Sequence, residues 1–241
     1  MAEKNAFTLN WRQSVVDVLL IVIGVSIALA ADSWLGDRIE QARTDQLLDA
    51  LEDEWTTELE RIDAHIDELS QAKAALARLI KAHDDSLEGL SNQEAAALFD
   101  GYRWSTFKSS DGALSTLMVD GVQNVDDKGL RMAIASWRTV LDELDAEQAA
   151  LRELGTLKIR SLAAKVAQES GERFSHEAME DDYWTYGMES GAFSRAVIAN
   201  DEWVANQRHL LNLLYDYQVQ LAAVRETLER NLTLLRGRAR N

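Results

Sequence analysis

The chain has 241 residues, no cysteine and no proline, and a formal net charge of −16. The lack of cysteine excludes disulfides and thiolate metal sites, and the acidic balance argues against nucleic acid and anionic lipid headgroups as general partners. Because proline breaks helices, its absence from a chain rich in Ala, Leu, Glu, Gln and Arg predicts an all-α protein with long, uninterrupted helices.

An apolar stretch near the start of the chain, residues 15–35, predicts a transmembrane helix behind a short tail of residues 1–14. Its centre, residues 18–31, carries no charge. Its 21 residues would rise about 31 Å as a helix, which matches a hydrocarbon core of about 30 Å. Trp11 and Trp34 bracket the stretch, as aromatic belts do at the two membrane–water interfaces.

Small residues within this stretch support two different interpretations. Gly24 and Ala28 lie four residues apart, a spacing that lets a second helix approach closely, although small residues are also common in membrane helices. The sequence Ala28-Leu29-Ala30 resembles a signal peptidase site, so cleavage is the alternative to a retained anchor. Retention is favoured, because no Gly or Pro interrupts the helix from Ala28 to Asp32 and because Trp34 and Leu35 extend its apolar face.

The remaining residues, 36–241, predict one helical domain that continues directly from the anchor. Its long helices are expected over residues 36–85, 126–170 and 201–238, with joints over residues 86–125 and 171–200. In the first helix, an apolar residue recurs every seventh position: Leu48, Trp55, Ile62, Leu69 and Leu76. These patterns predict a three-helix, coiled-coil-like bundle, which we expect to run up, down and up.

The last helix has the most regular pattern in the chain, with apolar residues in alternating steps of four and three from Leu210 to Leu235. Asn231 occupies a core position in that register. A single buried amide at such a position can fix helix alignment at some cost in stability.

The two joints contain aromatic clusters and a weak internal repeat. The clusters are Tyr102, Trp104 and Phe107 in one joint and Tyr183, Trp184 and Tyr186 in the other. They either line a pocket or dock a partner, or they close the ends of the bundle. Each cluster is followed by a similar short segment, starting at Gly112 and at Gly191, which suggests a duplicated unit.

No catalytic arrangement stands out, so the chain is predicted to be neither an enzyme nor a binder of metal or cofactor. The four histidines, His65, His83, His176 and His209, lack ligand partners at the right spacing. Ser70 and Lys73 have the Ser-x-x-Lys spacing of serine acyl enzymes but not the companion motifs. The carboxyl terminus carries a small basic cluster, Arg236, Arg238 and Arg240, which complements the dipole of the last helix or contacts an acidic partner.

Several segments resemble a family of uncharacterised bacterial single-span membrane proteins of about 250 residues. They are residues 23–30, Asp32-Ser33-Trp34, residues 110–114 and Leu130-Arg131. The resemblance implies an inner-membrane anchor with a helical domain outside the cytoplasm. It carries no established activity.

We therefore expect a membrane-anchored scaffold or interaction protein that acts through helix packing. The expected partners are the lipid bilayer, a second copy of the chain and an unidentified protein. The alternative is a sensory or ligand-binding domain that signals through a separate partner. The short amino-terminal tail favours a single-pass protein of the bacterial inner membrane with the bundle in the periplasm.

Overall fold

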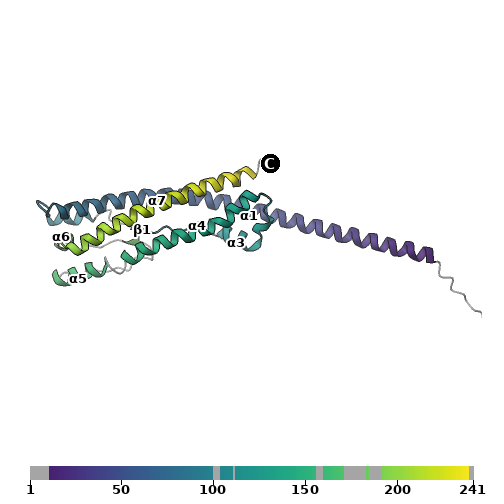
Figure 1. Ribbon diagram of the computed structural model, residues 1–241, viewed down its shortest axis with the longest axis horizontal. Coiled ribbons are helices and arrows are strands. Elements are labelled where there is room, and N and C mark those ends of the chain that lie inside the picture. The colour runs from purple at the N-terminus through teal and green to yellow at the C-terminus, as the bar shows by residue number, and fades with distance from the viewer. Residues whose placement is uncertain are drawn as a thin grey trace, which may run out of the picture.

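Long helices pack side by side into a bundle, and the first of them projects far beyond the others (Figure 1). The computed structural model describes residues 11–99, 104–110, 112–155, 160–170, 183–184 and 191–238. Within these residues the α-helices are α1 (Trp11–Asp84), α2 (Asn92–Leu98), α3 (Gly112–Asp120), α4 (Lys128–Glu153), α5 (Arg160–Ser170), α6 (Gly191–Ile198) and α7 (Asp201–Gly237). A 3₁₀ turn, η1 (Val122–Asn124), and two short strands, β1 (Trp104–Ser105) and β2 (Tyr183–Trp184), complete the described elements. The prediction of an all-α fold is confirmed.

Helix α1 is continuous over 74 residues, as predicted, and joins the apolar stretch to the bundle without a break. Every side chain described from residue 18 to 43 is exposed, and the first buried one is Thr44. Beyond that point the predicted seven-residue row is the buried face of the helix, because Leu48, Trp55, Ile62 and the residues that continue the row are each at most 3% exposed.

A second seven-residue row on α1 contains polar residues that apolar periodicity does not reveal. It runs from Leu51 through Glu58, His65 and Ala72 to Leu79, and all five residues are buried. Two other apolar residues beside the predicted row, Leu59 and Ile66, are only half-buried. The core of the bundle therefore encloses a carboxylate and an imidazole.

The directions of the three long helices follow from their contacts. Helix α7 runs antiparallel to α1, because Arg208 near its start pairs with Asp84 and Arg236 near its end pairs with Glu52. Helix α4 runs parallel to α1: its Trp137 packs against Trp55, and its Gln148 reaches the backbone of Phe107 beside His65.

The bundle thus runs up, up and down, so the predicted directions of both later helices relative to α1 are wrong. The chain between α1 and α4 returns along the whole bundle before α4 begins, as Figure 1 shows. This returning chain carries α2, β1 and α3. Strand β1 and helix α3 pack against α1, whereas α2 packs mainly against α6.

The expected helix over residues 126–170 is described as two helices. Helix α4 ends at Glu153, a wider π-type turn follows at Leu154 and Gly155, and α5 begins at Arg160. Gly155 is buried in this turn. A glycine inside a helix weakens it, which agrees with a break at this position.

Helix ends are set by side chains that the sequence identifies. Ser91 and Glu94 form a capping box at the start of α2. The Asp127 carboxylate accepts a hydrogen bond from the Leu130 amide and caps α4, and the Asn200 side chain does the same for the Trp203 amide at the start of α7. Gly121 follows α3 with a φ of 144°, which strongly favours glycine.

The two strands pair with each other and so connect the two aromatic joints, a pairing that the sequence did not predict. β1 and β2 pair antiparallel, with Trp104 opposite Trp184 and Ser105 opposite Tyr183. The pairing brings together the aromatic clusters that precede the two similar segments.

Candidate functional site

The first candidate site is the projecting half of α1. From Val18 on, α1 contains a segment long and apolar enough to cross a membrane, and no part of that segment is buried by the rest of the chain. A core helix of a soluble protein with the same composition would be covered by its neighbours. The predicted packing residues Gly24 and Ala28 both lie here, with no atom of another element within 4 Å of the position where a Gly24 Cβ would lie.

The predicted belt residues mark the two ends of this segment. Trp11 is the first residue of α1. Trp34 is 60% exposed, and the Arg38 guanidinium carbon lies 5.0 Å from the centre of its ring. About ten residues, or about 15 Å of helix, separate Trp34 from the first buried residue of the bundle, Thr44.

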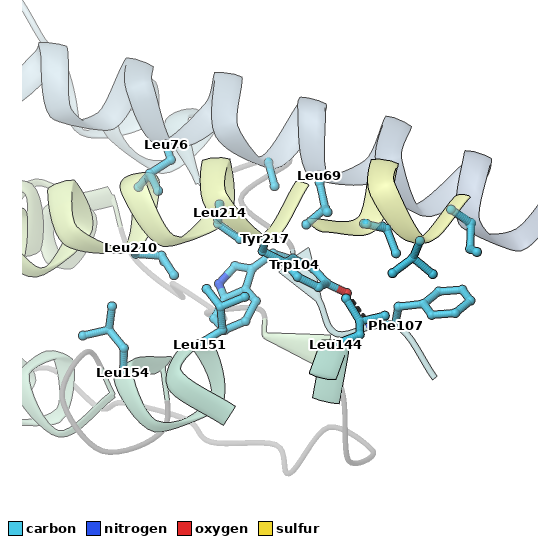
Figure 2. Close-up of a cluster of buried hydrophobic side chains, with 14 of the residues drawn as sticks. Leu69, Leu76, Trp104, Phe107, Leu144, Leu151, Leu154, Leu210, Leu214 and Tyr217 are labelled. Carbon is cyan, nitrogen blue, oxygen red and sulfur yellow. Dashed lines mark hydrogen bonds between the residues drawn. The ribbon is translucent and has the colours of Figure 1, made fainter. Parts of the chain in front are cut away.

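The second candidate site is a buried polar cluster in the middle of the bundle, where residues 104–110 cross between α1, α4 and α7. The Tyr217 hydroxyl of α7 accepts a hydrogen bond from the Phe107 amide at 2.8 Å (Figure 2) and lies 3.2 Å from His65 Nε2. On the other side of the imidazole, Nδ1 lies 3.4 Å from Ser105 Oγ and 3.5 Å from Glu68 Oε2.

These contacts define one direction of hydrogen bonding. Glu68 Oε2 is an acceptor and lies 3.5 Å from Nδ1, so we assign the proton of the neutral ring to Nδ1, and Nε2 then accepts the proton of the Tyr217 hydroxyl. Nδ1 then donates to Ser105 Oγ, and that hydroxyl donates to Glu68 Oε2. The cluster therefore links a buried tyrosine to a carboxylate at the surface.

Burial controls the titration of this cluster. It lowers the pKa of His65 below 6.5, and the nearby Glu68 carboxylate offsets only part of that effect. Burial likewise raises the pKa of the Tyr217 hydroxyl far above its usual range. Both groups are therefore neutral at physiological pH.

The lowered pKa of His65 predicts a bundle that loses stability as the pH falls below about 6.5, since the unfolded chain then binds a proton more readily than the folded one. The slope from this group is at most about 1.4 kcal/mol per pH unit. Denaturant titrations of the full chain in mild detergent between pH 7.5 and 5.5 would measure it. We expect His65→Gln to flatten the profile. The exposed His209→Gln is the matched control, and an unchanged profile in His65→Gln would contradict the assignment.

Two carboxylates one turn apart on α1 hold the chain that leads into α3. Glu54 accepts from the Ala113 amide at 2.7 Å and so supplies the N-terminal cap of that helix. Glu58, only 1% exposed, pairs with Arg61 at 2.9 Å and lies 3.5 Å from the Ser110 amide. Burial raises the pKa of the Glu58 carboxyl, while these partners favour its charged form.

Two surface clefts border residues 104–110. One, of about 390 Å³, lies between this segment and Arg61, His65 and Glu68 of α1. The other, of about 320 Å³, lies between Phe107, Lys108 and Ser109 and the middle of α4. Both volumes suit a small molecule.

The predicted aromatic residues are only partly described. Trp104 is 1% exposed and Phe107 is 7% exposed, so both pack into the core beside Tyr217 (Figure 2). Tyr183 and Trp184 form β2. Tyr102 and Tyr186 lie outside the described residues. A role for these residues in contacting a ligand or a partner stays a prediction.

The remaining sequence candidates have structural partners. Ser70 and Lys73 each hydrogen-bond to Gln218 of α7. His83 Nδ1 lies 2.8 Å from the Ile198 carbonyl oxygen at the far end of the bundle. Among the described residues, no group of three or more His, Cys, Asp or Glu side chains is placed to hold a metal ion. His176 and Arg240 lie outside the described residues.

Polar residues also join α7 to α1. Arg236 pairs with Glu52 at 2.9 Å, and Arg238 pairs with Asp49, so two of the three carboxyl-terminal arginines bind acidic partners within the chain. Asn231 is 6% exposed, at the predicted core position, and its Nδ2 has no hydrogen-bond partner. Its role in helix register stays a prediction.

Comparisons with known proteins found no family model, no curated protein and no solved structure that matches the chain. The resemblance to bacterial single-span membrane proteins thus rests on the sequence segments alone.

Proposed function

We propose that the chain is a membrane-anchored helical scaffold or interaction protein that acts through helix packing and oligomerisation and not through catalysis. The observation that carries the proposal is the projecting half of α1, which is apolar, uncovered by the rest of the chain, and continuous with the bundle. An uncovered apolar helix of this length is stable in lipid, where its backbone groups are satisfied internally.

The proposed location is the inner membrane of a bacterium, with residues 1–14 in the cytoplasm and the bundle in the periplasm. The acidic net charge of the chain supports a bundle that stands off from anionic lipid headgroups. The exposed helix between Trp34 and Thr44 supplies that separation.

Alkaline carbonate extraction of membranes that contain the full chain tests the anchoring. The native chain is expected to remain in the membrane pellet. The double variant Ile23→Arg, Ile27→Arg is expected to shift to the supernatant, because each arginine at the centre of a span costs about 2.5 to 3.5 kcal/mol. Met132→Arg, at a 63% exposed position on α4, is the matched control and should stay in the pellet.

Two outcomes of this experiment would overturn the anchor. The first is release of the native chain by carbonate. The second is a mature mass that lacks about the first 30 residues, which would mean that the site at Ala28-Leu29-Ala30 is cleaved.

The cleft beside His65 favours ligand binding as a second candidate function. It combines the Arg61 guanidinium, the Glu68 carboxylate and a neutral imidazole within about 390 Å³. A small molecule that raises the unfolding temperature of the native chain but not that of Glu68→Gln would support this candidate over a purely structural scaffold.

A further inference from the structure

Residues 104–110 form a non-helical segment inside the bundle, which we call the strap. Its first four residues are each at most 7% exposed. Beyond its short pairing with β2, the strap is held by side chains of the long helices. The Phe107 amide donates to the Tyr217 hydroxyl of α7 (Figure 2), and the Phe107 carbonyl oxygen accepts from Gln148 Nε2 of α4 at 3.0 Å. Side chains can rotate away from the strap while the helices that carry them stay intact.

The closed position of the strap has an unsatisfied polar group. Thr106 is 5% exposed, and its Oγ1 has no hydrogen-bond partner among the described residues. An unpaired buried hydroxyl disfavours burial. In addition, the cleft of about 390 Å³ lies between the strap and α1, with His65 in its wall. The strap therefore borders open space on its α1 side, and a proton from solvent reaches the imidazole through this space.

Charged groups around His65 would act on a positive imidazole. The titratable and charged groups that face it are Arg61 and Glu68 of α1, Lys108 of the strap, Tyr217 of α7 and, beyond Tyr217, Arg152 of α4. Glu68 is the carboxylate in direct contact, with Oε2 3.5 Å from Nδ1. The three basic groups disfavour a charge on the ring in its present place, whereas Glu68 attracts that charge toward the surface.

We infer that protonation of His65 releases the strap from α1 and α7 while the long helices stay packed. In the neutral cluster, Nε2 accepts the proton of the Tyr217 hydroxyl, which itself accepts from the Phe107 amide. A proton added to Nε2 turns this acceptor into a donor. The Tyr217 oxygen can accept from both neighbours, but its own proton then loses its acceptor. The contact that holds the Phe107 amide is therefore weakened.

The same proton weakens the hold on Ser105. Glu68 Oε2 lies 3.5 Å from Ser105 Oγ and 3.5 Å from His65 Nδ1, so the hydroxyl and the ring share one acceptor. A hydrogen bond between two charged groups is about twice as strong as one between neutral groups. The charged ring is thus expected to take Glu68 from Ser105. Gln148 keeps its bond to the Phe107 carbonyl oxygen, so the strap stays attached to α4 as the cleft beside α1 widens.

The pH range of the release follows from the buried position of His65. Burial lowers the pKa of His65 below 6.5, so the ring binds a proton more readily once the strap has moved away. The closed strap is therefore favoured at neutral pH and loses stability as the pH falls below 6.5. Below that value, opening becomes at most about tenfold more favourable per pH unit.

Hydrogen–deuterium exchange of the full chain in mild detergent tests the inference. Exchange is measured at pH 7.5 and 5.5 and corrected for its intrinsic pH dependence. We expect the protection of peptides that cover the strap to fall several-fold at pH 5.5, while peptides around Leu76 of α1 and Leu214 of α7 keep theirs. His65→Gln should remove the pH response of the strap. The exposed His209→Gln is the matched control and should retain the response.

Glu68→Gln is a second variant, which decides the test if His65→Gln does not fold. Its side chain is 31% exposed, and the substitution removes the carboxylate that attracts the charged ring. We expect the loss of strap protection to shift to lower pH. Three results would overturn the inference: protection of the strap that is independent of pH, an equal loss in α1 and α7, or a native pH response in either variant. None of these results depends on membrane anchoring, so they leave the proposed function untouched.

Discussion

Replacement of Trp55 by alanine is expected to lower the free energy of unfolding of the bundle by about 3 to 5 kcal/mol. Trp55 is 1% exposed, and its ring meets that of Trp137 edge to face, with the ring centres 6.1 Å apart. The substitution removes this contact and leaves a cavity where α1 meets α4, near the end of the bundle where α1 enters it. Denaturant titration of the full chain in mild detergent, followed by circular dichroism, measures the loss.

Two further variants show whether burial causes the effect. Trp34→Ala removes the same side chain from a 60% exposed position on the same helix and should leave the unfolding of the bundle unchanged. Trp55→Phe should cost much less than Trp55→Ala, because the ring is kept and the indole Nε1, which has no hydrogen-bond partner, is removed. Equal losses for Trp34→Ala and Trp55→Ala would contradict the described core.

Removal of the Tyr217 hydroxyl is the second large effect that we expect. Tyr217→Phe keeps the ring in the core but leaves the Phe107 amide and His65 Nε2 without partners, both in buried surroundings. Each unpaired buried group costs about 1 to 3 kcal/mol, so the predicted loss of stability for the two groups is about 2 to 6 kcal/mol. The same denaturant titration measures it.

Tyr215→Phe is the matched control, two residues earlier on α7. Tyr215 is 53% exposed, and the substitution keeps the ring that lies 3.9 Å from Lys73 Nζ, so we expect a change below about 0.5 kcal/mol. If Tyr217→Phe proved as mild as Tyr215→Phe, the directed chain of hydrogen bonds through His65 would be wrong.

The long helices and their buried face could be predicted from the sequence, because apolar residues every seventh position place one face of a helix in the core. The capping side chains of α2 and α4 were also predictable, since Ser91 and Asp127 act on amides only three residues away. Such features depend on local spacing, which a single sequence contains.

The buried polar cluster could not be predicted from apolar periodicity, because Glu58 and His65 are polar residues at core positions. One signal exists: they continue the seven-residue spacing that begins at Leu51 and ends at Leu79. Their partners Ser105, Phe107 and Tyr217 come from other parts of the chain, so the hydrogen bonds that make burial of the imidazole tolerable have no local signature.

The directions of α4 and α7 relative to α1 could not be predicted for a related reason. The joint after α1 is long enough either to turn once or to run back along the bundle. The choice depends on distant contacts, such as the cap that Glu54 provides to α3 and the pairing of β1 with β2. The sequence shows both partners of each contact but not that they meet.

The antiparallel order of α1 and α7 determines how the bundle would respond to tension. Arg236 and Arg238 join the last turns of α7 to Glu52 and Asp49 at the end of the bundle where α1 enters it. A pull on the carboxyl terminus against the amino-terminal end of α1 would therefore load these ion pairs first and peel α7 away one turn at a time. A pull applied between the carboxyl terminus and Asp84, at the far end of α1, would instead load the whole α1–α7 contact in shear, which requires many contacts to break together.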